Sequence, residues 1–167
     1  MPTPEYILTL REKIGHDYLW LSGATAVIRR DSDHRVLLVR RSDNGAWTPV
    51  TGIVDPDENP ALTCLREAHE EAGVEIEVLA LAQLKADPAM RFGNGDRCQF
   101  LDHTFLCRWV AGDARVNDDE STQVRWADMT DPTERAMLSE RMLDRIDAAL
   151  GYDGHCRFGY ESVSPKG

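Results

Sequence analysis

The stretch from Gly52 to Val74 constrains this chain of 167 residues most, because its second half reads as a helix with both ends marked. Asn59 suits the N-cap and Pro60 suits the first helical position. Gly73 occupies the place where a left-handed residue ends a helix. The sequence therefore predicts a helix from about Pro60 to Ala72, and the rest of the chain must pack against one side of it.

The predicted helix has two chemically different faces, calculated at about 100° per residue. An apolar stripe predicts the packed face and consists of Ala61, Leu65, Ala68 and Ala72. Three carboxylates lie nearly opposite, at Glu67, Glu70 and Glu71. Like charges at this spacing repel by about a few tenths of a kcal/mol per pair. A divalent cation would neutralise them, and hard oxygen ligands suit Mg²⁺ or Mn²⁺.

Three further residues flank the acidic face. Arg66 directly precedes the first carboxylate and can brace a neighbouring one by a bidentate contact. Glu58 lies at the mouth of the helix. Gly52, six residues earlier, marks a turn at which the backbone can approach a ligand closely. Backbone carbonyls near Gly52 would then complete the metal shell.

These positions together resemble the Nudix box. Gly52 is followed after five residues by Glu58, and after seven more by the run Arg66-Glu67-Ala68-His69-Glu70-Glu71-Ala72-Gly73-Val74. Every fixed position of the motif is filled, so the chain resembles the MutT-like Nudix hydrolases. Many relatives carry Leu-Pro-Gly-Gly after a tryptophan, whereas this chain has Pro49-Val50-Thr51-Gly52 and keeps the second glycine alone. The competing interpretation of a charge run is a solvated acidic helix face.

The resemblance implies an α/β fold, a Nudix-like α/β/α sandwich with a mixed β-sheet between helices. It also implies hydrolysis of a nucleoside diphosphate linked to another moiety, in the class of nucleoside triphosphates, ADP-ribose and nucleotide sugars. Water would attack a phosphoanhydride phosphorus, and Mg²⁺ or Mn²⁺ would be held by Glu67, Glu70 and Glu71. The general base varies within the family, so Glu67 and Glu120 are both candidates, with Asp119 behind them.

Several residues outside the box are candidates for substrate binding. Arg40 and Arg41 end a predicted strand that leads toward the box, and alternation along a strand lets one of them point into the site. Lys85 and Arg91 follow a later strand, where one or both can hold a distal phosphate. Trp47 can stack on a base, although packing against the box helix is the alternative for a tryptophan in that place.

The expected order of elements is strand, strand, helix, three strands and helix. The predicted strands cover residues 24–30, 35–41, 74–85, 98–110 and 122–127. Residues 4–15 predict a short amphipathic helix or arm, and Asp131 and Pro132 open a last helix that continues to Gly151. We expect an arm at residues 1–20, a Nudix domain at residues 21–151 and a tail at residues 152–167.

The net charge and the cysteines limit the classes of partner and the cellular compartment that we expect for this chain. A net charge of -10 argues against a nucleic acid polymer as partner, because phosphate backbones need clustered Lys and Arg. The four cysteines form no C-x-x-C pair, and the chain shows neither a signal peptide nor an 18-residue apolar run. We therefore expect a cytoplasmic protein with reduced thiols and no membrane contact. The apolar side of residues 4–15 suggests a homodimer.

Two other functions are compatible with a chain that carries this motif, an isomerase and a nucleotide sensor. One is an enzyme that is similar to isopentenyl diphosphate isomerase, which needs a catalytic cysteine ahead of the box region. The first cysteine here is Cys64, so none precedes Gly52. The other is a Nudix domain that senses a nucleotide without cutting it. Such domains usually lose box glutamates, whereas this chain keeps all four.

Overall fold

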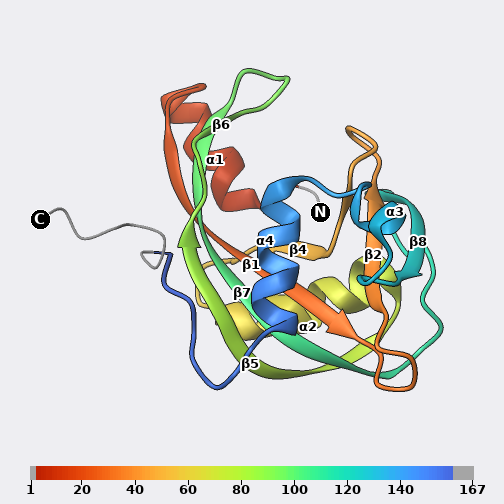
Figure 1. Ribbon diagram of the computed structural model, residues 1–167. Helices are drawn as coiled ribbons and strands as arrows, with labels where there is room; N and C mark the ends of the chain where they lie inside the picture. The colour runs from red at the N-terminus through yellow and green to blue at the C-terminus, as the bar shows by residue number, and fades with distance from the viewer. Residues whose placement is uncertain (1–2, 160–167) are drawn as a thin grey trace, which may run out of the picture.

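The computed structural model describes residues 3–159, which form one mixed sheet with α2 on one face and α4 on the other (Figure 1). The helices are α1 (Glu5–Ile14), α2 (Pro60–Ala72), α3 (Pro132–Arg135) and α4 (Glu140–Leu150). The strands are β1 (Leu19–Arg29), β2 (Val36–Arg41), β3 (Trp47–Thr48), β4 (Val50–Ile53), β5 (Glu75–Ala86), β6 (Met90–Arg91), β7 (Arg97–Ala111) and β8 (Ser121–Ala127). This layering confirms the expected α/β/α sandwich. None of the helices in the described part is long and apolar enough to cross a membrane.

The sheet is mixed because its centre is parallel and its flanks are antiparallel. Its main path runs β3-β2-β1-β7-β5, and β4, β6 and β8 pair with β1, β7 and β2. β1 and β7 are parallel along the whole of β1, from Leu19 beside Cys98 to Arg29 beside Arg108. β2 pairs with β1 at Arg29, whereas β4 pairs with β1 from Gly23 to Ala26. β2 and β4 thus occupy different stretches of the same edge of β1.

Alternate residues of β1 face the two helical layers, as the period of a strand requires. Ala24, Ala26 and Ile28 belong to the buried cluster under α2, together with Cys64, Ala68 and Ala72 of that helix. Val27 belongs to the cluster under α4, together with Leu38 of β2 and Ile146 of α4. The two apolar layers fix α2 and α4 against opposite faces of the sheet.

α1 packs against a third cluster near the beginnings of β1 and β7. Ile7 is buried there beside Leu21 and Cys98. Leu8 and Leu10 of the same helix are exposed. α1 therefore packs on the body of the protein through Ile7, while a homodimer through this helix stays a prediction. The proposed division into arm, domain and tail also stays a prediction, and residues 160–167 of the tail lie outside the described part.

The last predicted helix is interrupted, and this expectation was wrong. Asp131 does cap α3, since its side chain accepts a hydrogen bond from Thr133 N at 2.8 Å. However, α3 ends at Arg135, and α4 begins at Glu140 with Ser139 as its own N-cap. A second capping residue begins a new helix because its side chain satisfies amides that a continuous helix would bond internally.

A buried ion cluster ties α4 to the sheet. Arg145 of α4 is 5% exposed, and its Nη2 lies 2.5 Å from Oδ2 of Asp87, which follows β5. Its Nη1 lies 2.8 Å from Thr25 Oγ1 and 3.3 Å from Asp102 Oδ1. Burial raises the pKa of Asp102, and Arg145 opposes that shift. A buried charge is tolerated when it is paired and hydrogen-bonded, so this cluster depends on all of its members.

We expect Arg145→Ala to lower the free energy of unfolding by about 3–5 kcal/mol, because it leaves Asp102 buried without its cation and leaves Asp87 with the longer contact to Arg141 alone, at 3.4 Å. Urea denaturation at neutral pH measures the loss. Arg135→Ala is the matched control, since Arg135 pairs with Asp147 at the surface and exposed pairs contribute under about 1 kcal/mol. An equally small loss for both variants would contradict the role assigned to the cluster.

Candidate active site

The helix predicted from the box is present with the predicted ends. α2 runs from Pro60 to Ala72, and Gly73 is left-handed with φ 65°. Gly73 N donates to His69 O at 3.0 Å. Asn59 occupies the N-cap position, although within the described residues its side chain makes no capping hydrogen bond. Local sequence signals therefore located α2 correctly.

The orientation of α2 about its axis differs from the prediction. Glu67 and Glu71 are 1% and 5% exposed, so two of the three carboxylates face the protein interior. The side chain of Glu70 is 49% exposed, while Leu65 of the predicted apolar stripe is 39% exposed. The expectation that all three carboxylates lie opposite the packed face was wrong. The helix buries acid because the strand beneath it provides room, at Gly52.

Gly52 makes that room by lacking a side chain. It lies within β4 rather than in the predicted turn, in register with Ala24 of β1. A Cβ added at Gly52 would lie 2.5 Å from Glu67 Oε1, closer than atoms pack. The glycine thus admits the Glu67 carboxylate against the backbone of β4. A role for the Gly52 carbonyl as metal ligand stays a prediction.

Arg66, at the middle of α2, connects Glu58 before the helix with two carboxylates of the helix itself. Its Nε and Nη2 donate to the two oxygens of Glu58, each at 2.9 Å, in a bidentate pair. Its Nη1 donates to Glu67 Oε1 at 2.7 Å and to Glu70 Oε2 at 3.3 Å. The bidentate pair lowers the pKa of Glu58 to about 2 and raises the pKa of Arg66. The contact predicted for Arg66 is therefore present, and Glu58 is its main partner.

The two buried carboxyl groups are poorly compensated. Burial raises the pKa of Glu67 to about 7, although Arg66 opposes the shift. Burial also raises the pKa of Glu71 to about 8, and the neighbouring charge of Glu67 raises it further. Within the described residues, Glu67 Oε2 is buried without a hydrogen-bond partner. Two adjacent buried acids with an unsatisfied oxygen form a site that a cation would stabilise.

The two arginines at the end of β2 point in different directions. Arg41 interacts electrostatically with Glu71, while its Nε and Nη2 donate to Asp43 at 3.0 and 2.6 Å. Arg40 Nε instead donates to Gly45 O at 3.1 Å. The pairing of β2 with β8 is irregular between these two residues. Arg41 is thus the arginine that lies near the carboxylates of α2.

The acidic loop before β8 lies beside the C-terminal end of α2. Asn117 N donates to Glu71 O at 3.2 Å, and the charge of Asp118 contributes to the raised pKa of Glu71. Glu120 is held through its backbone, because its carbonyl accepts from Ser42 N at 2.7 Å. Sequence reasoning named Glu120 and Asp119 and missed Asp118. The acidic run was the available signal, but it does not reveal which acid faces the helix.

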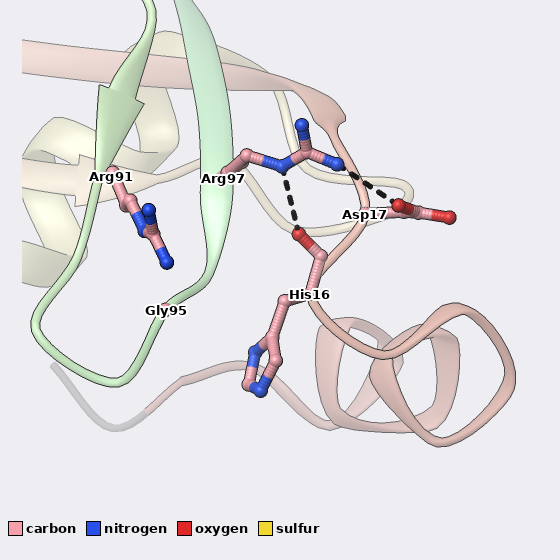
Figure 2. Close-up of a pocket in the computed structure, with 5 residues that line it drawn as sticks. All are labelled: His16, Asp17, Arg91, Gly95 and Arg97. Atoms are coloured by element: carbon pink, nitrogen blue, oxygen red, sulfur yellow. Dashed lines mark hydrogen bonds and ion pairs between the residues drawn. The ribbon is translucent and has the colours of Figure 1, made fainter.

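Three predicted substrate contacts lie elsewhere. Trp47 packs in the cluster under α4, with the guanidinium carbon of Arg125 5.8 Å from the centre of its ring. Lys85 Nζ donates to Oδ2 of Asp144, a residue of α4, at 2.8 Å. Arg91 lines a separate pocket by the turn between β6 and β7, with His16 and Arg97 among its neighbours (Figure 2). A substrate role for Trp47, Lys85 and Arg91 stays a prediction without support from these positions.

The residues on α2 fit a divalent cation by their chemistry. Carboxylate oxygens are the ligands that Mg²⁺ and Mn²⁺ prefer, and Glu67 presents a buried oxygen without a partner. No three acidic, His or Cys side chains of residues 3–159 already converge as a metal site. Arg66 instead supplies the counter-charge to Glu67 and Glu70. A cation would therefore replace part of the Arg66 contacts when it binds.

Comparison with known proteins identifies the motif and the fold. A model of the NUDIX domain matches residues 20–147. The "MutT-like protein" of Streptomyces ambofaciens is 33% identical over 131 residues, which cover 77% of this chain and 78% of that protein. The "Dihydroneopterin triphosphate diphosphatase" of Haemophilus influenzae is 27% identical over 92 residues, which cover 48% of this chain and 57% of the relative. A solved "NUDIX hydrolase from Nitrosomonas europaea" has a similar fold, with a TM-score of 0.62 and 21% identity over 80% of this chain and 90% of that one.

The raised pKa of Glu71 predicts how stability depends on pH in the absence of metal. Its folded pKa of about 8 exceeds the ordinary value of about 4.3. The folded state therefore keeps a proton that the unfolded chain releases, and stability falls as pH rises through this window. We expect Glu71→Gln to be more stable than the wild type at about pH 8 by about 2 kcal/mol or more, since one pKa unit is worth about 1.4 kcal/mol.

Urea denaturation in chelator at several values between about pH 4 and pH 8 measures this difference, which should vanish at the acid end. Glu75→Gln is the matched control, because Glu75 is exposed at the beginning of β5. A Glu71→Gln protein that is less stable than the wild type at the alkaline end would contradict the burial of an uncompensated acid.

Proposed function

This chain belongs to the Nudix hydrolase family, and we propose that it hydrolyses a nucleoside diphosphate derivative with Mg²⁺ or Mn²⁺. Water would attack a phosphorus atom of the phosphoanhydride linkage. The observation that carries this proposal is the buried pair Glu67 and Glu71 on the box helix, with an oxygen of Glu67 left without a partner. Paired, desolvated acids of this kind occur where a metal or a reaction needs them.

The roles of the residues follow from their positions. Glu67, Glu70 and Glu71 would hold the cation, which would offset the charge that develops on the leaving phosphate. Arg66 would keep the carboxylates oriented through its bidentate pair with Glu58. Arg41 is placed to contact a phosphate, because it lies near Glu71 at the end of β2. Glu67 and Glu120 remain the candidates for general base, with Asp119 behind them.

A small nucleotide is the substrate class that these features favour. The net charge of -10 disfavours a polymer of phosphates. The relative from Haemophilus influenzae is named as a diphosphatase of dihydroneopterin triphosphate, which is a small triphosphate. Free nucleoside triphosphates, ADP-ribose and nucleotide sugars share a diphosphate that a metal bound on α2 would contact. A cytoplasmic location, where such nucleotides are found, belongs to the same proposal.

We expect activity to require Mg²⁺ or Mn²⁺ and Glu71→Gln to lower kcat by about two orders of magnitude or more. Losing a ligand removes several kcal/mol of charge stabilisation in the transition state, and about 1.4 kcal/mol corresponds to a factor of ten. Steady-state assays across a nucleotide panel, with and without chelator, measure both effects. Glu75→Gln is the control and should keep wild-type activity. Full activity of Glu71→Gln, or of the wild type in excess chelator, would overturn the metal assignment.

The bond that breaks can be identified separately. Hydrolysis in ¹⁸O-labelled water should place the label on a phosphate group of one product, because the carboxylates of α2 would direct the metal to the diphosphate. Mass spectrometry of the separated products detects it. Label on a sugar carbon would contradict attack at phosphorus.

A further inference from the structure

The C-terminal end of α2 is closed by a segment that lies more than 40 residues later in the chain. The last carbonyls of a helix lack partners within it, and here residues 115–117 provide donors for them. Arg115 N donates to Ala72 O at 3.1 Å, and Asn117 N donates to Glu71 O at 3.2 Å. The side-chain Nδ2 of Asn117 donates to His69 O at 3.0 Å and to Glu70 O at 3.2 Å. Asn117 alone thus contacts the backbone of two metal-ligand candidates.

The same segment packs closely against the residues that end the helix. Gly112 has φ 92°, and a Cβ there would lie 2.6 Å from Gly73 O, so only a glycine fits without displacing the backbone. The guanidinium of Arg115 lies over Gly73, 3.0 Å from where its Cβ would be. A cation at this end complements the negative pole of the helix dipole. The loop is therefore seated on α2 by backbone packing as well as by hydrogen bonds.

The other end of the segment is fixed to β2. Ser42 N, next to Arg41, donates to Glu120 O at 2.7 Å. Asp118 and Asp119 lie between this contact and Asn117, and Asp118 Oδ1 accepts from Glu120 N at 3.0 Å. Asp118 directly follows Asn117, whose amide donates to the backbone carbonyl of Glu71, and the charge of Asp118 helps to raise the pKa of the Glu71 carboxyl. Two attachments thus hold a short acidic span against the proposed metal site.

We propose that Asn117 is a positioning residue that seats this span on α2 and thereby sets the place of the Asp118 carboxylate relative to Glu71. The inference rests on the proposed function, because it concerns the acids around the cation. Glu71 and Asp118 come from different elements, and the side-chain amide of Asn117 donates two of the hydrogen bonds that join those elements. When this amide is lost, the backbone bonds remain but hold the span less firmly, so the Asp118 carboxylate becomes more mobile and the cation loses part of a nearby negative charge.

The test measures Mn²⁺ binding to the full chain by electron paramagnetic resonance, which needs no turnover. We expect Asn117→Ala to weaken Mn²⁺ binding about tenfold, the scale of effect seen when a group that orients metal ligands is removed. Asn117→Gln keeps an amide donor and should recover part of the affinity. Asn94→Ala is the matched control, since Asn94 also donates from an exposed loop, to Asp96 at 3.0 Å, and it should bind Mn²⁺ like the wild type.

A double-mutant cycle decides whether Asn117 acts through Asp118. If it does, Asn117→Ala should add little further loss of Mn²⁺ affinity to Asp118→Asn. Amide hydrogen exchange in metal-free protein should show faster exchange at residues 115 and 117 in Asn117→Ala. Unchanged Mn²⁺ affinity in Asn117→Ala, or fully additive losses in the cycle, would overturn this inference alone. A wild type that binds no Mn²⁺ would overturn the proposed function as well.

Discussion

The contact between Gly52 and Glu67 is the constraint on which the site depends. α2 can press against β4 with an acid in between because the strand has no side chain at that point. This contact sets the rotation of α2, which in turn buries Glu71 and leaves Glu70 at the surface. A side chain at Gly52 would occupy the space of the Glu67 carboxylate, so Glu67 would have to leave its place against β4.

The arrangement around these acids offsets part of the energy that their burial requires. Arg66 lies between the exposed face and the buried face of α2. Its guanidinium donates to Glu67 and so compensates part of that charge. The bidentate pair with Glu58 fixes the position of the Arg66 guanidinium. The loop at residues 115–117 completes the hydrogen bonding of α2 at its C-terminal end. Arg66 thus acts from the middle of the helix and the loop from its end, while Glu67 and Glu71 remain only partly compensated. Local stabilising rules are commonly broken in this way at functional sites.

The sequence predicted those features that local chemistry determines and missed those that depend on distant residues. The ends of α2 follow from Pro60 and Gly73, which act within a turn of the helix, so both were found. The rotation of α2 depends on a glycine in another strand, which no period within the helix can reveal. Asp118 was missed for the same reason, since the register of its loop is set by the carbonyls of α2. The break between α3 and α4 was missed because an apolar period runs through Ser139 without interruption.

The parallel pairing of β1 with β7 has a consequence for the order in which this molecule folds. Leu19 lies beside Cys98, 79 positions later in the chain, and the same separation holds to the end of β1. Closing so large a loop costs chain entropy, which is offset only when many contacts between the strands have formed. Topologies of this kind fold slowly. The box, with α2, lies inside that loop. β7 must therefore be synthesised before the central sheet can close, and the apolar layer under α2 is complete only when Phe105 and Cys107 of β7 have joined it.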